Sequence, residues 1–236
     1  MKVMLVQPPK LGPGGVLDSL KYPPIGLAVL ASVLRGKGMD AMLFDANIER
    51  GDPIEMAVKI IRGGGVFAVG LGFSSVLAGG AYLLADRLKS AAPGIHVIAG
   101  GYHPTVMAEE VAMRPSIDYV VAGEGEETLP ELLDALTLGC EPNGVKGLFF
   151  ERSGRIVSTG PRPLVPDLDC VPIPAYDLLR LDGYSSLSST RRPFATLVRS
   201  RGCPFRCFFC GVDKMFTRRY RCQSPERTMK EILYLV

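Results

Sequence analysis

Three closely spaced cysteines are the residues of this chain whose types and spacing most clearly suggest chemistry. Cys203, Cys207 and Cys210 stand in the run Arg-Gly-Cys-Pro-Phe-Arg-Cys-Phe-Phe-Cys, directly after a short apolar stretch. Thiolates gathered on one loop suit a soft metal. A cubic iron–sulfur cluster has four irons, so three cysteines leave one iron open to another ligand. The spacing therefore indicates a metal centre, with an iron–sulfur cluster as its first candidate.

Other uses of these cysteines have to be weighed against a cluster. Three cysteines cannot pair among themselves, and the chain is typical of a reducing compartment, so a disulfide use is disfavoured. A structural zinc site stays open as an alternative, because Cys222 is available as a fourth ligand. Zinc sites usually bring their thiolates as two CxxC pairs, however, and Cys140 and Cys170 lie far upstream.

The cysteine run resembles the hallmark of the radical S-adenosylmethionine (SAM) superfamily. It has the same spacing, Cx3Cx2C, and the same aromatic position before the last cysteine, here Phe209. The resemblance implies that Cys203, Cys207 and Cys210 hold a [4Fe–4S] cluster and that Phe209 packs near SAM. In that family the open iron chelates the amino and carboxylate groups of SAM, whose reductive cleavage releases a 5′-deoxyadenosyl radical.

The composition is that of an ordinary globular protein. Hydrophobic residues make up 47% of the 236 positions and charged residues 22%. The apolar run at the N-terminus is too short for the core of a signal peptide, and no segment approaches the length of a transmembrane helix. We therefore expect a cytoplasmic protein without a membrane span.

Charge is distributed unevenly along the chain. Residues 1–179 carry 15 Lys and Arg against 20 Asp and Glu, whereas residues 180–236 carry 12 against 4. A basic, cysteine-bearing tail raises the question of nucleic acid, but no pattern of aromatic and basic residues accompanies the charge, so we expect no nucleic-acid partner. We expect some arginines to balance an anionic cluster and a carboxylate-bearing cofactor, and others to face acidic surface outside this chain. The first group is Arg199, Arg201 and Arg206, and the second is Arg218, Arg219 and Arg221.

Residues 1–138 read as strands that alternate with helices. Near-continuous apolar strands joined by helical crossovers indicate a parallel sheet covered on both faces. Five such units fit an α/β fold with a flavodoxin-like (Rossmann-like) doubly wound sheet of order 2-1-3-4-5, in which ligands bind at the carboxyl ends of the strands. The expected strands are Val3–Val6, Ala41–Phe44, Val66–Leu71, His96–Ala99 and Tyr119–Ala122; the expected helices are Ile25–Arg35, Pro53–Arg62, Ala81–Ser90, Glu109–Met113 and Glu127–Leu138.

The rest of the chain divides into a connector and the start of another domain. Residues 140–190 contain an expected hairpin and a proline-rich stretch, which is typical of a connector. Phe194–Val198 then reads as a strand, the cysteine loop follows, and Pro225–Val236 reads as a helix. The expected organisation is a ligand-binding domain over 1–139, a connector over 140–190, and the first βα unit of a truncated TIM-type radical SAM barrel over 191–236.

The order of landmarks in the first domain resembles the cobalamin-binding domain of one branch of the radical SAM superfamily. The landmarks are Pro-Pro-Ile-Gly-Leu at 23–27, Gly-Gly-Tyr-His at 100–103 and Gly-Glu-Gly-Glu at 123–126, and the cysteine loop and Ser-Pro-Glu at 224–226 follow them. The resemblance covers nearly the whole chain and implies a cobalamin cofactor. By their positions after the strands, the residues expected to line its site are Ser74, Ser75, Gly100, Gly101 and Gly123.

One departure concerns the lower ligand of the cobalt. Many cobalamin domains carry Asp-x-His-x-x-Gly after the first strand, and this chain lacks that motif and has only His96 and His103. The branch generally lacks the motif too. The resemblance therefore implies a cobalamin whose lower axial site receives no protein histidine. We expect His103 to cap backbone groups in a loop rather than to bind cobalt.

Other cofactors fit the first domain less well. A nicotinamide site is suggested by Gly12-Pro13-Gly14-Gly15 after the first strand and by Asp45 at the end of the second. The fingerprint requires a third glycine at the helix start, but position 17 is Leu. A phosphate-binding P-loop lacks its Gly-Lys-Ser/Thr. A response-regulator module needs an acidic cluster on the first strand, where Gln7 stands.

Together these patterns predict part of a cobalamin-dependent radical SAM enzyme. The resemblance implies a [4Fe–4S] cluster, SAM and cobalamin as cofactors, a small-molecule substrate, and an external electron donor such as a flavodoxin or ferredoxin. It implies chemistry at an unactivated carbon, with methyl transfer favoured over cyclisation or rearrangement. Because a full barrel needs about 200–250 residues, we expect this length of chain to turn nothing over by itself. The alternatives are a non-catalytic cobalamin-binding module and a zinc-bearing nucleic-acid-binding protein.

Overall fold

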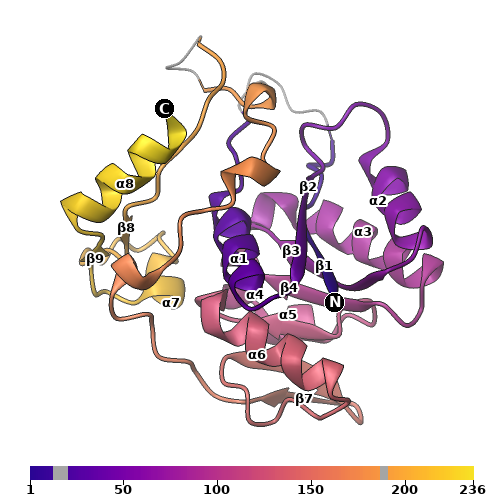
Figure 1. Cartoon of the computed structure of the whole chain (residues 1–236). Coiled ribbons are helices and arrows are strands. Elements are labelled where there is room, and N and C mark those ends of the chain that lie inside the picture. Colours follow the sequence, from indigo (N-terminus) through magenta and orange to yellow (C-terminus); the bar gives the residue numbers. More distant parts are fainter. Residues whose placement is uncertain (13–20, 187–190) are drawn as a thin grey trace.

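The computed structural model describes residues 1–12, 21–186 and 191–236. Its main sheet has the strand order β2-β1-β3-β4-β5-β6-β7, and β1 to β5 are parallel (Figure 1). This order confirms the doubly wound 2-1-3-4-5 sheet expected from the sequence. The strands are β1 (Lys2–Gln7), β2 (Asp40–Asp45), β3 (Val66–Gly72), β4 (His96–Gly100), β5 (Tyr119–Val121), β6 (Leu148–Arg152) and β7 (Arg155–Ser158).

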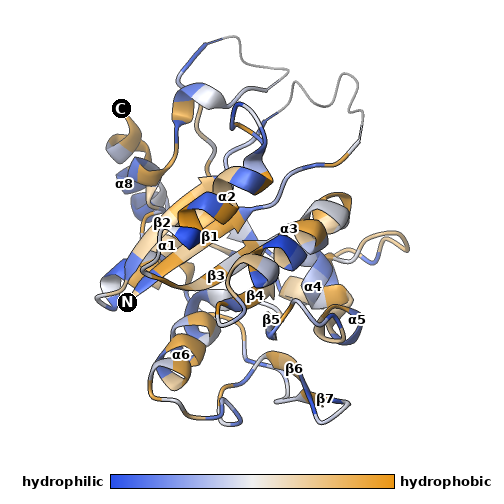
Figure 2. Cartoon of the chain, turned by 90° about the vertical axis from the view of Figure 1, so that its right-hand side faces the viewer, coloured by the Kyte–Doolittle hydropathy of each residue, from blue (hydrophilic) through white to orange (hydrophobic). Residues whose placement is uncertain are grey.

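Helices cover both faces of the sheet, and β1 shows why. Met4 and Val6 belong to one apolar cluster, with α2, α3 and α5, whereas Val3 and Leu5 belong to a second, with α1 and α6. Successive side chains of a strand point to opposite faces, so a strand that is apolar throughout needs cover on both. The hydrophobic strands between helices are visible in Figure 2. The helices are α1 (Ile25–Gly36), α2 (Pro53–Arg62), α3 (Ala78–Ala91), α4 (Tyr102–Val106), α5 (Ala108–Ala112), α6 (Gly125–Thr137), α7 (Val212–Phe216) and α8 (Pro225–Leu235).

Local signals explain where two of these helices begin. The Asp52 carboxylate accepts hydrogen bonds from the backbone N–H groups of Ile54 and Glu55 at the start of α2. The Ser224 hydroxyl accepts one from Arg227 N–H at the start of α8. In both helices proline occupies the first position, where no N–H is needed. Both starts were therefore predictable from the sequence.

The hairpin in residues 140–190 adds to the sheet instead of standing apart from it. Strand β6 pairs antiparallel with β5, and β7 pairs with β6, so both extend the main sheet at its edge. Further along, residues 173–175 lie along α1, where Ala175 N–H donates to the carbonyl of Ala28 and the Ser32 hydroxyl donates to that of Ile173. The domain boundaries drawn from the sequence stay a prediction.

The expected strand Phe194–Val198 is wrong in its position. Within the described residues this segment pairs with no other strand, and a strand is stable only when its N–H and C=O groups have a neighbouring strand. Pairing begins later, where β8 (Ser200–Arg201) lies antiparallel to β9 (Arg221–Cys222). Helices α7 and α8 accompany this pair beside α1 (Figure 1). In the described part, no helix is long and apolar enough to cross a membrane.

Candidate functional site

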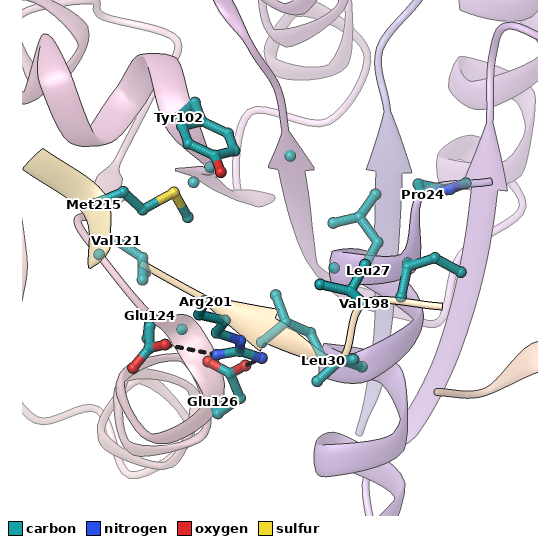
Figure 3. Close-up of a pocket in the computed structure, with 18 of the residues that line it drawn as sticks. Pro24, Leu27, Leu30, Tyr102, Val121, Glu124, Glu126, Val198, Arg201 and Met215 are labelled. Carbon is teal, nitrogen blue, oxygen red and sulfur yellow. Dashed lines mark hydrogen bonds and ion pairs between the residues drawn. The ribbon is translucent and has the colours of Figure 1, made fainter. Parts of the chain in front are cut away.

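A cavity of about 660 Å³ opens at the carboxyl ends of the parallel strands. One side consists of backbone and small side chains that follow β3, β4 and β5, together with the first turns of α1. The other side comes from the C-terminal segment, which contributes Val198, Arg201, Cys203 and Met215 (Figure 3). This is the place where ligands bind in doubly wound sheets. The cavity therefore joins the edge of the sheet to the start of the cysteine loop.

The strand ends approach one another closely because of one glycine in particular. Gly101 has φ +97°, and a Cβ there would lie 3.0 Å from both the backbone N and the carbonyl O of Phe73. A side chain at this position would be strained and would push the ends of β3 and β4 apart. Gly101 thus allows the ends of β3 and β4 to lie close together at the cavity.

Four of the five residues expected at the cobalamin site line the cavity in the described part of the chain, and Ser75 does not. The four are Ser74, Gly100, Gly101 and Gly123. Ser75 begins the short 3-10 helix η2 (Ser75–Leu77), and its hydroxyl lies 3.0 Å from Nδ1 of His103. That any of them binds cobalamin stays a prediction.

The expectation that His103 caps backbone groups is wrong for its ring. It lies in α4, and its Nε2 is 2.9 Å from the Tyr82 hydroxyl while its Nδ1 is 3.0 Å from the Ser75 hydroxyl. Both ring nitrogens therefore have side-chain partners. Burial lowers the pKa of His103, so the ring is held in its neutral form at pH 7. His96, at the start of β4, packs against Phe67.

The cysteine loop carries thiols that suit a soft metal, and most of them are exposed to solvent. Cys203 is half-buried on the cavity wall, whereas Cys207 and Cys210 are exposed, and all three are free thiols. A turn joins the latter two, in which Cys210 N–H donates to the carbonyl of Cys207. Within the described residues no three His, Cys, Asp or Glu side chains are arranged to hold a metal ion. The donor types and the shared loop fit a cluster, while the side-chain arrangement is not yet that of a ligand cage.

Phe209 stands apart from the cavity in this structure. Its side chain is 78% exposed, and its ring packs edge-on against that of Phe208. The contact with SAM implied by the resemblance stays a prediction.

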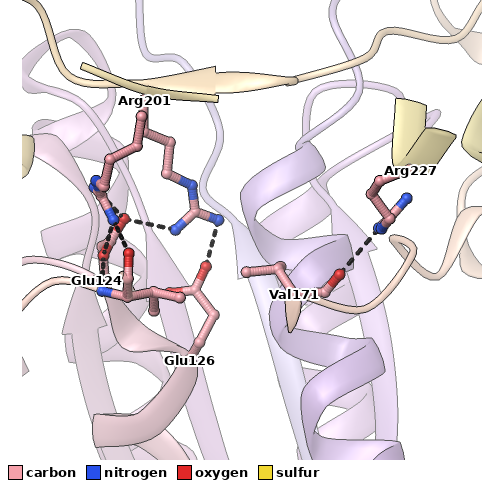
Figure 4. A network of polar contacts seen from close by, with 7 residues as sticks. Glu124, Glu126, Val171, Arg201 and Arg227 are labelled. Carbon is pink, nitrogen blue, oxygen red and sulfur yellow. Dashed lines mark hydrogen bonds and ion pairs between the residues drawn. The ribbon is translucent and has the colours of Figure 1, made fainter. Parts of the chain in front are cut away.

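A buried network of acidic and basic side chains fixes the C-terminal segment to the sheet domain. Arg201 donates to Glu124 Oε1 at 2.8 Å and to Glu126 Oε1 at 2.5 Å (Figure 4). Arg221 donates to both oxygens of Glu124, at 2.9 and 3.0 Å. Burial by itself would raise the pKa of Glu124, but the hydrogen bonds from Arg221 and Arg201 outweigh it and lower that pKa. We call these four residues the Glu–Arg network.

This network corrects two expectations from the sequence. Arg201 was expected to balance a cluster and a cofactor, and Arg221 to face acidic surface outside the chain. Both instead neutralise carboxylates of the sheet domain, because Glu124 and Glu126 precede and begin α6 at the same edge of the cavity. Arg218, from the second group, pairs with Asp213 in α7. Glu124 and Glu126 were missed, although the doubled Gly-Glu of residues 123–126 marked the place.

Asp45, considered as a ribose-binding acid, has a different role in this fold. One carboxylate oxygen accepts from the backbone and side-chain N–H groups of Asn47, and burial raises the pKa of Asp45. Pro13, Gly14 and Gly15 of the proposed nicotinamide loop lie outside the described residues. The bonds from Asn47 show that Asp45 shapes the turn after β2.

Comparison with known proteins finds a matching family and several relatives. The family described as "B12 binding domain" matches residues 18–133. Among curated relatives, an uncharacterised methyltransferase of Pyrococcus horikoshii is 38% identical over 100% of this chain and 50% of its own length. An anaerobic magnesium-protoporphyrin IX monomethyl ester cyclase of Synechocystis is 29% identical over 100% of this chain and 47% of its own length.

A solved structure shows the same fold over nearly the whole chain. It is that of the cobalamin-dependent S-adenosylmethionine radical enzyme OxsB with aqua-cobalamin and S-adenosylmethionine bound. The TM-score is 0.77 at 23% identity, over 98% of this chain and 31% of that one. The chain spans about half the length of the curated relatives it matches. By its matched domain, its relatives and its fold, the chain is similar to cobalamin-dependent radical SAM enzymes.

Proposed function

We propose that the chain binds cobalamin in the cavity and holds a [4Fe–4S] cluster on Cys203, Cys207 and Cys210, with SAM at the open iron. When bound, these groups supply reductive cleavage of SAM and methyl transfer to an unactivated carbon of a small molecule. A flavodoxin or ferredoxin is the electron donor we propose. The relatives named above include both a methyltransferase and a cyclase, and we favour methyl transfer.

One observation carries this proposal. The cavity at the strand ends has the glycine backbone of β4 on one side and Cys203 on the other, so the two expected cofactor regions share a wall. Residues 100 and 203 are far apart in the sequence, and the fold alone brings them to one place. A cofactor in the cavity would therefore lie next to whatever the cysteine loop holds.

The chain's own residues contribute shape and exclusion of water. Leu27 and Leu30 from α1, together with Val198 and Met215 from the C-terminal segment, give the cavity an apolar lining (Figure 3). An apolar lining excludes water, which protects reactive intermediates. Gly100 and Gly101 add backbone without side chains to this lining. His103 lies outside this lining with both ring nitrogens bonded to side chains, so it would not be available to hold the cobalt of a bound cobalamin.

Anaerobic reconstitution tests the proposal. The chain is incubated with iron, sulfide and hydroxocobalamin, desalted, and analysed for its visible spectrum, iron, acid-labile sulfide and zinc. We expect retained cobalamin absorption and a broad band that dithionite bleaches. A variant with Cys203→Ala, Cys207→Ala and Cys210→Ala is expected to keep cobalamin and lose the bleachable band.

Two results would contradict parts of the proposal. Stoichiometric zinc without acid-labile sulfide would show that the cysteines form a structural zinc site and not a cluster site. If the folded chain lost all cobalamin on desalting, the proposal that the cavity binds cobalamin would be wrong.

A further inference from the structure

The strand pair β8–β9 has an arrangement that is unfavourable by itself. Arg201 and Arg221 are direct partners across the two strands. Their side chains are 13% and 5% exposed, so neither charge is well solvated. Like charges directly opposite in an antiparallel pair destabilise it, and burial makes the repulsion stronger. Something must stand between the two guanidinium groups to keep the pair formed.

Glu124 meets this need. Its side chain is 4% exposed, and its Oε1 accepts from both arginines. Its Oε2 accepts from Arg221 and from the backbone N–H of Val165, and Arg221 in turn donates to the carbonyl of Val165. Glu126 adds a second carboxylate on Arg201, so two negative charges face two positive ones. The charges of the network are therefore balanced, which buried charges require, although Arg221 Nε is buried without a hydrogen-bond partner among the described residues.

The two arginines also stand at the two ends of the cysteine loop. Residues 202–220, which include all three clustered cysteines, leave the strand pair after Arg201 and return to it at Arg221. At the first end, a Cβ on Gly202 would lie 2.1 Å from the carbonyl O of Arg219, so the loop closes tightly there. Holding Arg201 and Arg221 to one carboxylate therefore fixes both ends of the loop to the edge of the cavity.

The contacts argue against a catalytic use of these groups. Every oxygen of Glu124 already accepts at least two hydrogen bonds, and a carboxylate so engaged is a poor proton acceptor. Arg201 likewise uses both terminal nitrogens on Glu124 and Glu126. The hydrogen-bonding groups of Glu124 and Arg201 are thus used to hold the C-terminal segment to the sheet domain.

We propose that Glu124 and Glu126 are positioning residues for the cysteine loop. Through Arg201 and Arg221 they fix both ends of the loop, and this keeps Cys203 on the wall of the cavity that the sheet domain forms. The inference rests on the proposed function for its purpose, because a fixed loop sets the separation between the cluster and the cobalamin. The positioning itself is a property of the chain without cofactors.

Hydrogen exchange of the cofactor-free chain tests it directly. In Glu124→Gln we expect exchange in peptides covering β8 and β9 to accelerate about tenfold or more, while β3 changes by less than about twofold. Glu126→Gln removes the charge of a less buried carboxylate that, within the described structure, bonds only to Arg201, so it should accelerate the same peptides by about threefold and is the variant to use if the first does not fold. Glu126→Asp keeps the charge and should restore most of the protection.

Glu127→Gln is the matched control. Glu127 lies one residue further along α6 and pairs with Arg162, away from the cysteine loop. We expect it to leave β8 and β9 at the wild-type rate. Equal acceleration of β3 and β8 in the Glu126→Gln variant would show a general stabilising role and overturn the inference. Unchanged exchange in β8 and β9 in both variants would overturn it as well.

Thiol reactivity gives a readout that separates position from stability. In the cofactor-free Glu126→Gln variant, alkylation of Cys203 should speed up by about threefold relative to the exposed Cys140, and Glu126→Asp should reverse this. An unchanged ratio would contradict a positioning role. If wild-type chain fails to retain cobalamin, the proposed function fails, but these cofactor-free measurements still decide the inference.

Discussion

In the main sheet Val3, Met4, Leu5 and Val6 are completely buried, whereas in the cysteine loop Phe208 is 100% and Phe209 78% exposed. The sheet obtains its stability from its own side chains, and each buried Val or Leu contributes about 1.5–3 kcal/mol. The cysteine loop is held instead at its two ends, by the Glu–Arg network and by Gly202. The sheet side of the cavity is therefore fixed by buried apolar contacts, whereas the cysteine loop is fixed mainly through polar contacts at its ends.

The largest expected effect is on the sheet. Leu132 is completely buried in α6 against the face formed by Val3 and Leu5. Leu132→Ala should reduce the free energy of unfolding by about 2–5 kcal/mol, because it removes apolar contacts and leaves a cavity. Thermal or denaturant unfolding measures this. Leu233→Ala, at a 66% exposed position in α8, is the contrast and should change it by less than about 0.5 kcal/mol. An equal loss of unfolding free energy in both variants would contradict the claim that the sheet and the C-terminal segment are stabilised differently.

The next effect belongs to the loop. Gly202→Ala combines φ +83° with a Cβ 2.1 Å from the Arg219 carbonyl O, so we expect a local cost of about 1–3 kcal/mol. Hydrogen exchange should accelerate in residues 200–222 and not in β3. Gly154→Ala is matched in backbone strain, with φ +78°, but meets open space, so its effect should be smaller and confined to the β6–β7 turn. Comparable exchange in the two variants would show that the close contact at Gly202 does not stabilise the loop.

A pH dependence separates the two regions further. The pKa of Glu124 lies below its ordinary value of 4.5, so its contribution is present at higher pH and is lost as pH falls through the lowered pKa. Protection of β8 and β9 should therefore hold at pH 7 and weaken below about pH 4.5 in the wild-type chain. Glu124→Gln should show weak protection at both pH values. A wild-type loop whose protection is the same at pH 3 as at pH 7 would contradict the role of Glu124.

The smallest effect is expected at His103. Because its ring nitrogens bond to Ser75 and Tyr82, His103→Ala should leave the visible spectrum and the retention of cobalamin unchanged. The spectrum of desalted protein measures this. A shift of the cobalamin bands in the variant would show that the histidine reaches the cobalt after all.

The sequence predicted the sheet well because each strand and helix carries its own local signal. Asp52 followed by Pro53 marks a helix start, and the apolar run at Val3–Val6 marks a strand buried on both faces. The Glu–Arg network could not be predicted in this way. Glu124 and Arg221 are 97 positions apart, and no periodicity connects them. Phe194–Val198 was misplaced for the same reason, since strand pairing depends on neighbours that a local pattern does not contain.

Electron paramagnetic resonance can test whether one cavity brings the two cofactors together. The chain is reconstituted with both cofactors and reduced so that cob(II)alamin and the reduced cluster are present in one sample. We expect the cob(II)alamin signal to relax faster than in the variant that lacks Cys203, Cys207 and Cys210. Identical relaxation in the two samples, with the cluster shown to be present and reduced, would contradict it.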